Sequence, residues 1–312
     1  MKTIFVINPK AGQEKDIDKI SKEILEASQR LNADAEVYVT SCPGDAEKYV
    51  REYSRDNPST RFIACGGDGT LGEIVNGAFG AEDVQIGVMP MGTGNDFCRN
   101  FPSKELFSQP LAQMLGKPQK CDVIKYTTEL EGRIVQRYGI NMFNIGFDCN
   151  VADMTNEMKT KPFVSGSMAY FLSILSILIK KKGASLLVEL DGKTVHKGPL
   201  LLTSIANGSF CGGGVKSNPT AVISDGIMDV NIVKNISRLN FLSKLPFYMK
   251  GTHIKLKNVE KIISAHKCKK ITVTPLSGNM RLCVDGEIFD AGKTEFEVIH
   301  NGIAFVVPEK TL

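Results

Sequence analysis

The stretch Cys65-Gly66-Gly67-Asp68-Gly69-Thr70 decides how this sequence is interpreted. It follows a short apolar run over 61–65, which is typical of a buried strand, and it precedes a helical pattern over 70–79. A glycine-rich turn between a strand and a helix N-terminus forms an anion site, because the backbone can approach a phosphate and free N–H groups point at it. Asp68 would repel a phosphate, so we expect it to hold Mg²⁺ or a metal-bound water. Taken alone, such a loop is also typical of a simple turn with a helix cap.

Two similar loops accompany this one. Asn8-Pro9-Lys10-Ala11-Gly12 follows a predicted strand over 3–8, and Pro90-Met91-Gly92-Thr93-Gly94-Asn95-Asp96 follows another over 85–89. Loops at the carboxyl ends of parallel strands face the same crevice, where ligands bind. We therefore expect the three loops to converge, with polar side chains that could contact a nucleotide: Asn8, Thr70, Thr93 and Asn95.

The order of the predicted elements divides the chain into two parts near 117–121. The first part alternates strands with helices, which argues for a parallel sheet covered by helices; the helices are expected at 14–31, 44–56 and 70–79, with a further strand at 35–40. The second part is a run of strands, which suggests a β-sandwich or barrel. Its strands are expected at 122–128, 134–143, 185–190, 200–206, 226–233, 270–275, 280–284 and 303–307, with helical patterns only at 151–180 and 237–250.

Length and composition are those of an ordinary globular protein. The 312 residues, 42% hydrophobic and 23% charged, suffice for two domains. The apolar run near the start is too short for a signal peptide, and the longest apolar stretch, 168–179, falls short of the roughly 20 residues of a spanning helix. The eight cysteines have no zinc-type spacing, so we expect reduced, buried cysteines in a cytoplasmic protein.

Positive charge is concentrated in one region. Residues 234–270 contain ten Lys or Arg and one acid, a net +9, whereas the whole chain carries only +4 and the remainder therefore −5. The region is either a solvated basic face or a surface for anionic lipid head groups; no nucleic acid partner is expected. The segment 163–179, which includes the apolar stretch 168–179, is followed directly by Lys180–Lys182. It is interpreted either as core packing or as an interfacial helix.

Six motifs together resemble the catalytic domain of diacylglycerol and related lipid kinases, and most of all the bacterial soluble members. The three loops above are the first three motifs. The others are Asn207-Gly208 followed by Gly212–Gly214, the run Ser224–Asp229, and Val284-Asp285-Gly286-Glu287. One departure is Gly72, where the family usually has Asn, while Glu73 is in place.

The resemblance implies a domain plan and a set of ligands. It implies an ATP-binding α/β domain similar to NAD kinase and phosphofructokinase, at 1–120 with about 303–312, and a β-sandwich domain for the lipid at 121–302. Mg²⁺ would be held by the Asp225 carboxylate and the carbonyls of Val222 and Ile227, with Asp68, Asp96 and Asp122 connected through waters. The implied ATP ligands are Asn8, Pro9, Ala11, Gly12, Thr40, Gly66, Gly67, Asp68, Gly69, Thr70, Glu73, Gly92, Thr93 and Asn95.

Catalysis is assigned to acidic residues. The chain contains no P-loop motif and no protein-kinase signature, and no nucleophile arrangement is apparent, so direct in-line transfer is expected. By resemblance Asp285 is the general base, assisted by Glu287, with Asp68 also catalytic; an Asp-Gly hairpin turn is the alternative for Val284–Glu287.

The implied reaction is phosphorylation of a membrane lipid hydroxyl, first of all diacylglycerol to phosphatidic acid. Sphingosine-like bases, ceramide, undecaprenol and phosphatidylglycerol are alternative acceptors. An NAD kinase-like enzyme and a non-catalytic nucleotide sensor are the alternative functions. The expected setting is cytoplasmic, in peripheral contact with the anionic inner face of the membrane, and a homodimer is compatible with the resemblance.

Overall fold

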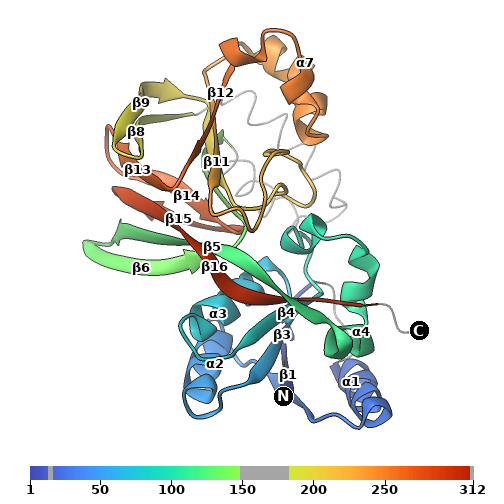
Figure 1. Cartoon of the computed structure of the whole chain (residues 1–312). Coiled ribbons are helices and arrows are strands. Elements are labelled where there is room, and N and C mark those ends of the chain that lie inside the picture. Colours follow the sequence, from blue (N-terminus) through green and yellow to red (C-terminus); the bar gives the residue numbers. More distant parts are fainter. Residues whose placement is uncertain (13–16, 148–182, 310–312) are drawn as a thin grey trace, which may run out of the picture. The chain divides into compact units, whose positions relative to one another are not determined.

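The computed structural model describes residues 1–12, 17–147 and 183–309 (Figure 1). The chain forms two compact units. The first comprises Met1–Val123, Ile223–Asp225 and Ile299–Leu312, and the second comprises Ile124–Val222 and Gly226–Val298. Two long strands, β5 (Lys117–Leu130) and β16 (Thr294–Val307), contribute residues to both units.

The first unit is an α/β domain, as the alternation of strands and helices predicts. Its parallel sheet has the order β2-β1-β3-β4, and the last part of β16 joins parallel to β4. The elements are β1 (Lys2–Ile7), α1 (Ile17–Leu31), β2 (Ala35–Val39), α2 (Asp45–Asp56), β3 (Thr60–Gly66), α3 (Asp68–Ala78), β4 (Gln85–Pro90), 3₁₀ turns at Phe97–Asn100 and Lys104–Ser108, and α4 (Pro110–Leu115).

Helices cover both faces of this sheet, and its central strands are therefore almost entirely buried. All seven residues of β3 are buried. On one face α1 and α4 lie together, and α2 and α3 lie on the other (Figure 1). The predicted helical stripe of α1 packs Ile17, Ile20 and Ile24 against Phe5 and Ile63. Each fully buried side chain of this size stabilises the fold by about 1.5–3 kcal/mol.

The second unit is an antiparallel β-sandwich. One sheet has the order β12-β11-β10-β7-β14-β15; the other joins β16, β13, β8 and β9 with β5 and β6. Side chains from both sheets, including Phe143, Val188, Val230, Val273 and Phe296, form its core. The elements are β6 (Arg133–Gly139), β7 (Met142–Gly146), β8 (Ala184–Leu190), β9 (Lys193–Leu200), β10 (Leu202–Ala206), β11 (Met228–Val233), α7 (Arg238–Met249), 3₁₀ turns at His253–Lys255 and Val259–Lys261, β12 (Ile263–Cys268), β13 (Lys270–Pro275), β14 (Met280–Val284) and β15 (Glu287–Ala291).

The predicted single strand over 134–143 is wrong. The structure has two strands, β6 and β7, with a break at Ile140 and Asn141. The backbone amides of Ile140, Asn141 and Met142 donate to the carboxylate of Asp285 rather than continuing a ladder. Three further strands were not predicted, namely β9, β12 and β15, because exposed and charged residues interrupt their apolar patterns.

Two other expectations concern the cysteines and the segment 163–179. Of the seven described cysteines, all free, five are buried as expected, but Cys211 is half-buried and Cys42 is exposed. The segment 163–179 and Lys180–Lys182 lie outside the described residues. Within the described part of the chain, no helix has the length and apolar character needed to cross a membrane.

Candidate functional site

The three glycine-rich loops of the first unit meet at the carboxyl ends of β1, β3 and β4. The amide of Asn8 donates to the carbonyl of Cys65 at 3.0 Å, and its side-chain nitrogen Nδ2 donates to Thr70 Oγ1 at 3.1 Å. The amide of Met91 donates to the carbonyl of Gly66 at 2.8 Å. The expected convergence of the loops is therefore present.

Close backbone contact explains why these loops need glycine. Gly12 has φ +77°, and a Cβ there would overlap the carbonyl oxygen of Met91. A Cβ on Gly92 would lie 2.6 Å from the Cα of Gly67. Any side chain at either position would force the loops apart.

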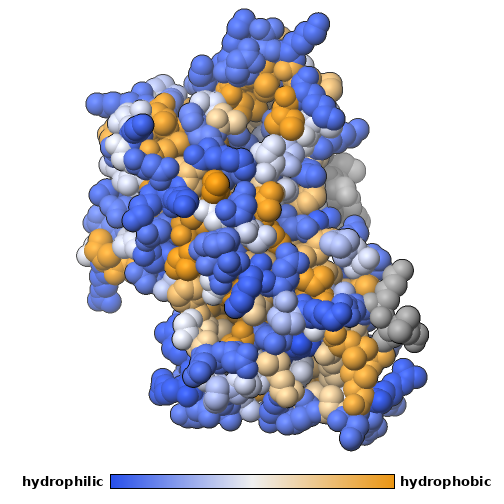
Figure 2. Space-filling model, in the orientation of Figure 1, coloured by the Kyte–Doolittle hydropathy of each residue, from blue (hydrophilic) through white to orange (hydrophobic). Residues whose placement is uncertain are grey.

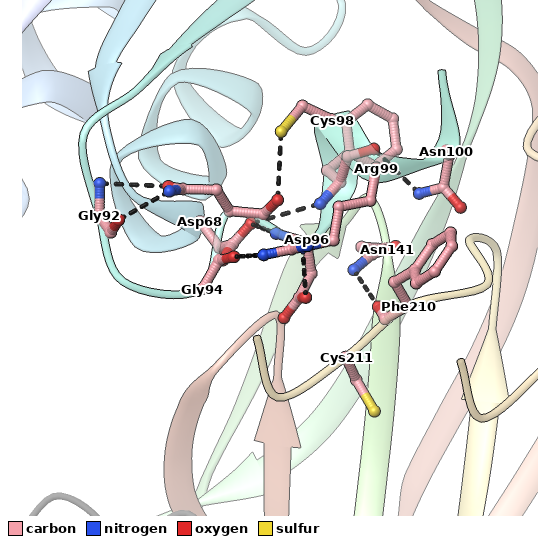
Figure 3. A network of polar contacts seen from close by, with 12 residues as sticks. Asp68, Gly92, Gly94, Asp96, Cys98, Arg99, Asn100, Asn141, Phe210 and Cys211 are labelled. Carbon is pink, nitrogen blue, oxygen red and sulfur yellow. Dashed lines mark hydrogen bonds and ion pairs between the residues drawn. The ribbon is translucent and has the colours of Figure 1, made fainter. Parts of the chain in front are cut away.

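Asp68 joins two of these loops (Figure 3). It is the first residue of α3, and its Oδ1 accepts from the amide of Asp96 at 2.9 Å. A carboxylate at a helix N-terminus is favoured by the helix dipole. The third loop is closed by Asn95, whose Nδ2 donates to the carbonyl of Gly92 at 2.6 Å while its Oδ1 accepts from the Gly92 amide at 3.1 Å.

Arg99 and Cys98 complete this corner of the first unit. Arg99 donates to the carbonyl of Gly94 at 3.1 Å and lies 3.4 Å from the Asp96 carboxylate. Burial, together with the charge of Asp68, raises the pKa of the Cys98 thiol to about 11. Because the thiol stays protonated at neutral pH, it acts as a donor, to the carbonyl of Asn95 at 3.1 Å, and not as a nucleophile.

The remaining predicted ATP ligands surround the loops. The amide of Thr40 donates to the carbonyl of Ile7 at 2.9 Å, next to Asn8. Glu73 lies on α3, but its two carboxylate oxygens accept from the amides of Gly44 at 2.9 Å and Ala46 at 3.2 Å, at the start of α2. Glu73 thus accepts hydrogen bonds from two backbone amides at the N-terminus of α2, and its role toward ATP stays a prediction. Among the others, Pro9 and Thr93 are exposed, whereas Ala11 and Gly69 are half-buried.

Asp122 is a buried acid in the first unit that ties distant segments together. Its Oδ1 accepts from the amide of Asn301 at 2.7 Å and lies 2.8 Å from His300 Nδ1, and its amide donates to the carbonyl of Ile223 at 2.7 Å. The contact with His300 spans 178 residues of sequence, and no local pattern in the sequence predicts it. The backbone of Asp122 therefore holds Ile223, the residue directly before the Ser224–Asp229 motif.

The predicted Mg²⁺ ligands are divided between the two units. Asp225 belongs to the first unit, whereas Val222 and Ile227 belong to the second, so this ligand set stays a prediction. Within the described ranges, no group of three His, Cys, Asp or Glu side chains could hold a metal ion. The donor chemistry nevertheless fits Mg²⁺, which prefers a few oxygen ligands with waters: carboxylate oxygens of Asp68 and Asp96 lie 2.7 and 3.5 Å from the position that a Cβ on Gly94 would take.

A second polar cluster lies in the second unit around Asp285. This residue forms the β14–β15 turn with φ +48°. Its Oδ2 accepts from the amide of Ile140 at 2.7 Å, and its Oδ1 accepts from the amides of Asn141 at 3.0 Å and Met142 at 2.7 Å. Such hydrogen bonds favour the ionised carboxylate. Asp285 therefore fixes the break between β6 and β7, while Glu287 is exposed at the start of β15.

The Asn207-Gly208 motif meets the same break. Asn207 donates from its side chain to the carbonyl of Ile140 at 2.8 Å, and the amides of Asn207 and Gly208 both donate to the carbonyl of Asn141. Asn141 in turn donates to the carbonyl of Phe210 at 2.8 Å (Figure 3). The Asn207-Gly208 motif and the Val284–Glu287 motif, which are far apart in sequence, thus both contact residues 140 and 141.

Buried polar side chains in the sandwich were missed by the sequence analysis. Ser204 pairs in register with Asn144 on one side and Asn231 on the other. Ser204 donates to Asn218 Oδ1 at 2.7 Å, and Asn231 donates to the carbonyl of Ser217 at 3.1 Å. These two bonds hold residues 217 and 218, which precede the predicted Mg²⁺ ligands at 222–227. Polar residues inside apolar strands were the signal that could have revealed them.

Comparisons with known proteins agree along the whole chain. Residues 2–126 match the family described as diacylglycerol kinase catalytic domain, and residues 141–307 match the YegS C-terminal NAD kinase beta sandwich-like domain. A diacylglycerol kinase of Bacillus subtilis is 27% identical over 310 residues, covering 98% of this chain and 96% of its own. A diacylglycerol kinase of Staphylococcus carnosus is 30% identical over 288 residues, covering 91% and 87%.

Solved structures share the fold. A crystal structure of a diacylglycerol kinase from Bacillus anthracis has a TM-score of 0.70 at 20% identity and covers 98% of this chain and 96% of its own. Yeast NADH kinase has a TM-score of 0.51 at 11% identity, covering 100% and 84%, and this likeness concerns the fold alone. From the two matched domains and the sequence identity, the chain belongs to the lipid kinase family of diacylglycerol kinases and YegS-like proteins.

Proposed function

We propose that this protein transfers the γ-phosphoryl group of ATP to the hydroxyl of a membrane lipid, with diacylglycerol as the acceptor and phosphatidic acid as the product. The observation that carries the proposal is the junction of three glycine-rich loops around Asp68, together with the family to which the chain belongs. The names of the bacterial relatives support diacylglycerol as the first acceptor to test.

Backbone amides of the loops and the N-terminus of α3 would bind the phosphates of ATP. The sequence has no P-loop lysine, so these amides and a metal must offset the phosphate charge. Mg²⁺, when bound, would neutralise charge on the transferred group. Asp68 would orient that metal or one of its waters, while its Oδ1 keeps the 91–96 loop in place.

Acidic residues of the second unit would take the proton of the acceptor hydroxyl. In direct transfer the lipid oxygen bonds to the γ-phosphorus, the bond to the ADP oxygen breaks, and the hydroxyl proton passes to a carboxylate. Asp285 with Glu287 is our proposed pair. Because three amides already bind Asp285, replacing Asp285 would disturb the break between β6 and β7, whereas replacing Glu287 leaves those three bonds in place.

A label-transfer assay tests the proposal. Mixed micelles containing diacylglycerol, sphingosine or phosphatidylglycerol, and NAD as a soluble acceptor, are incubated separately with the protein, Mg²⁺ and ATP labelled at the γ-phosphate. We expect label in phosphatidic acid. Label in another lipid alone would overturn the acceptor assignment, and label only in NAD would overturn lipid kinase activity itself.

A matched pair of variants ties any activity to the site. Gly12→Ala should abolish transfer, because the added Cβ overlaps the Met91 carbonyl oxygen. Gly72→Ala is the control, since a Cβ at this α3 position meets nothing within 4 Å. Wild-type transfer by Gly12→Ala would mean that the activity does not depend on the junction of the loops.

A further inference from the structure

Helix α7 of the second unit is firmly attached along one side. Ser237 caps it by accepting from the amide of Asn240 at 3.3 Å. Phe241 and Leu245 pack against the apolar cluster that includes Leu201, and the rings of Phe147 and Phe241 are 4.8 Å apart between centroids. The helix is therefore held in a defined orientation on the sandwich.

The other side of α7 exposes large apolar side chains. Leu239 is 80% exposed, and Leu242, Phe247 and Met249 are also exposed, as is Ile254 in the following turn. At about 100° per residue, Leu239 and Phe247 fall on the side opposite Phe241 and Leu245, while Leu242 and Met249 flank the packed side. Figure 2 shows hydrophobic side chains gathered over this helix with hydrophilic ones around them. Contiguous exposed apolar surface of this kind marks a place of interaction.

Unpaired lysines surround these apolar residues. From residue 234 to residue 261 the chain has six lysines and Arg238 against one acid, Glu260, a net charge of +6. Among the described residues, none of these lysines forms an ion pair with an acidic side chain. They are Lys234, Lys244, Lys250, Lys255, Lys257 and Lys261.

We propose that this α7 patch, made of Leu239, Leu242, Phe247, Met249, Ile254 and the six lysines, docks the protein on an anionic membrane surface. Exposed apolar side chains of such a patch would reach the acyl boundary of a bilayer, and the lysines interleaved with them would lie among the head groups. The proposal rests on the proposed function, because it supplies the contact with the bilayer in which a lipid acceptor resides.

The charge pattern favours a membrane over a protein partner. Lysine is depleted in protein interfaces, whereas each lysine near an anionic leaflet strengthens binding. A second copy of the same patch would bring +6 against +6. An anionic bilayer offers both the opposite charge and the apolar layer that the patch requires.

Vesicle sedimentation without ATP tests the patch directly. The probe is phosphatidylcholine vesicles with or without about 30% phosphatidylglycerol. We expect Lys250→Gln with Lys255→Gln to weaken binding to the anionic vesicles about 25-fold, since each lysine contributes about fivefold. Leu239→Ser with Leu242→Ser should weaken it at least tenfold, because the apolar insertion is lost.

Matched controls lie elsewhere in the same unit. Ile134 on β6 is 74% exposed, and Lys193 and Lys197 on β9 are exposed. Ile134→Ser, and Lys193→Gln with Lys197→Gln, should change binding less than twofold. Patch variants that bind within twofold of the wild type would overturn the proposal. A patch variant with a lower melting temperature and unchanged vesicle binding would do the same, since the patch would then be covered within the protein.

Activity in the absence of vesicles separates this proposal from the proposed function. With a short-chain diacylglycerol present as monomers, the patch variants should transfer phosphate at the wild-type rate, since no bilayer is involved. If the wild type phosphorylates no lipid and the patch variants still lose vesicle binding, the docking surface stands and the function fails. If the wild type phosphorylates a lipid and the patch variants bind vesicles as the wild type does, the function stands and the docking surface fails.

Discussion

Replacing Asp285 by Asn should destabilise the second unit, whatever its effect on catalysis. The amide oxygen of Asn can keep the bonds from Asn141 and Met142, but its NH₂ group then faces the amide of Ile140, at a position now 2.7 Å from a carboxylate oxygen. Losing one charge-assisted bond costs about 1.5–3 kcal/mol, and weakening two others costs roughly 1–2 kcal/mol more. We expect a total of about 3–5 kcal/mol.

Thermal and urea unfolding measure this change. In a unit of this size about 3–5 kcal/mol corresponds to a melting temperature lower by roughly 6–20 °C. Glu287→Gln is the matched control, since this exposed residue lies two positions further on at the start of β15 and its replacement keeps all three bonds to Asp285. Its melting temperature should fall much less than that of Asp285→Asn. A wild-type melting temperature for Asp285→Asn would refute our account of the turn.

The same two variants separate structural from chemical roles. If Glu287 takes the proton, Glu287→Gln should lose kcat while losing much less stability than Asp285→Asn, and the remaining activity should no longer rise with pH in the acid range. If Asp285 takes it, Glu287→Gln should keep most of its activity. In that case Asp285→Asn should stay inactive even at low temperature, where the variant is folded.

Three further predictions concern other parts of the molecule. Gly12→Ala should destabilise the first unit by about 1–3 kcal/mol and weaken ATP binding, because φ is +77° and the added Cβ overlaps the Met91 carbonyl oxygen. Gly72→Asn should change neither the stability nor ATP binding, and calorimetry on both variants measures the two effects. Asp68→Asn should keep the bond to the 91–96 loop but lose the charge, so ATP binding measured with Mg²⁺ and with EDTA should become alike; a Mg²⁺ dependence equal to the wild type would exclude Asp68 as the metal-orienting group. Burial lowers the pKa of His253 below its usual value near 6.5. As pH falls, the unfolded chain therefore takes up the proton first, and the free energy of unfolding decreases below about pH 6.5. His253→Phe should make the free energy of unfolding in urea depend less on pH between pH 7 and pH 5, and an unchanged dependence would contradict this.

Local patterns in the sequence were enough to predict much of this protein. The alternation of strands and helices gave the parallel sheet, and the position of glycines directly after three strands predicted that their loops would meet. These features depend on neighbours in the chain: an apolar run forms a buried strand, and a glycine permits a tight turn or a close backbone approach.

Only the tertiary structure decided what several polar side chains do. Asp285 interrupts a strand that lies about 145 residues earlier in the chain, Glu73 satisfies the start of α2, and Asp122 holds Asn301. The sequence likewise showed that residues 234–270 are basic, but only the fold showed that α7 also leaves apolar side chains exposed among those lysines. The physical reason is that a buried carboxylate takes whichever N–H donors the fold brings to it, and an apolar side chain is covered or exposed according to what packs above it.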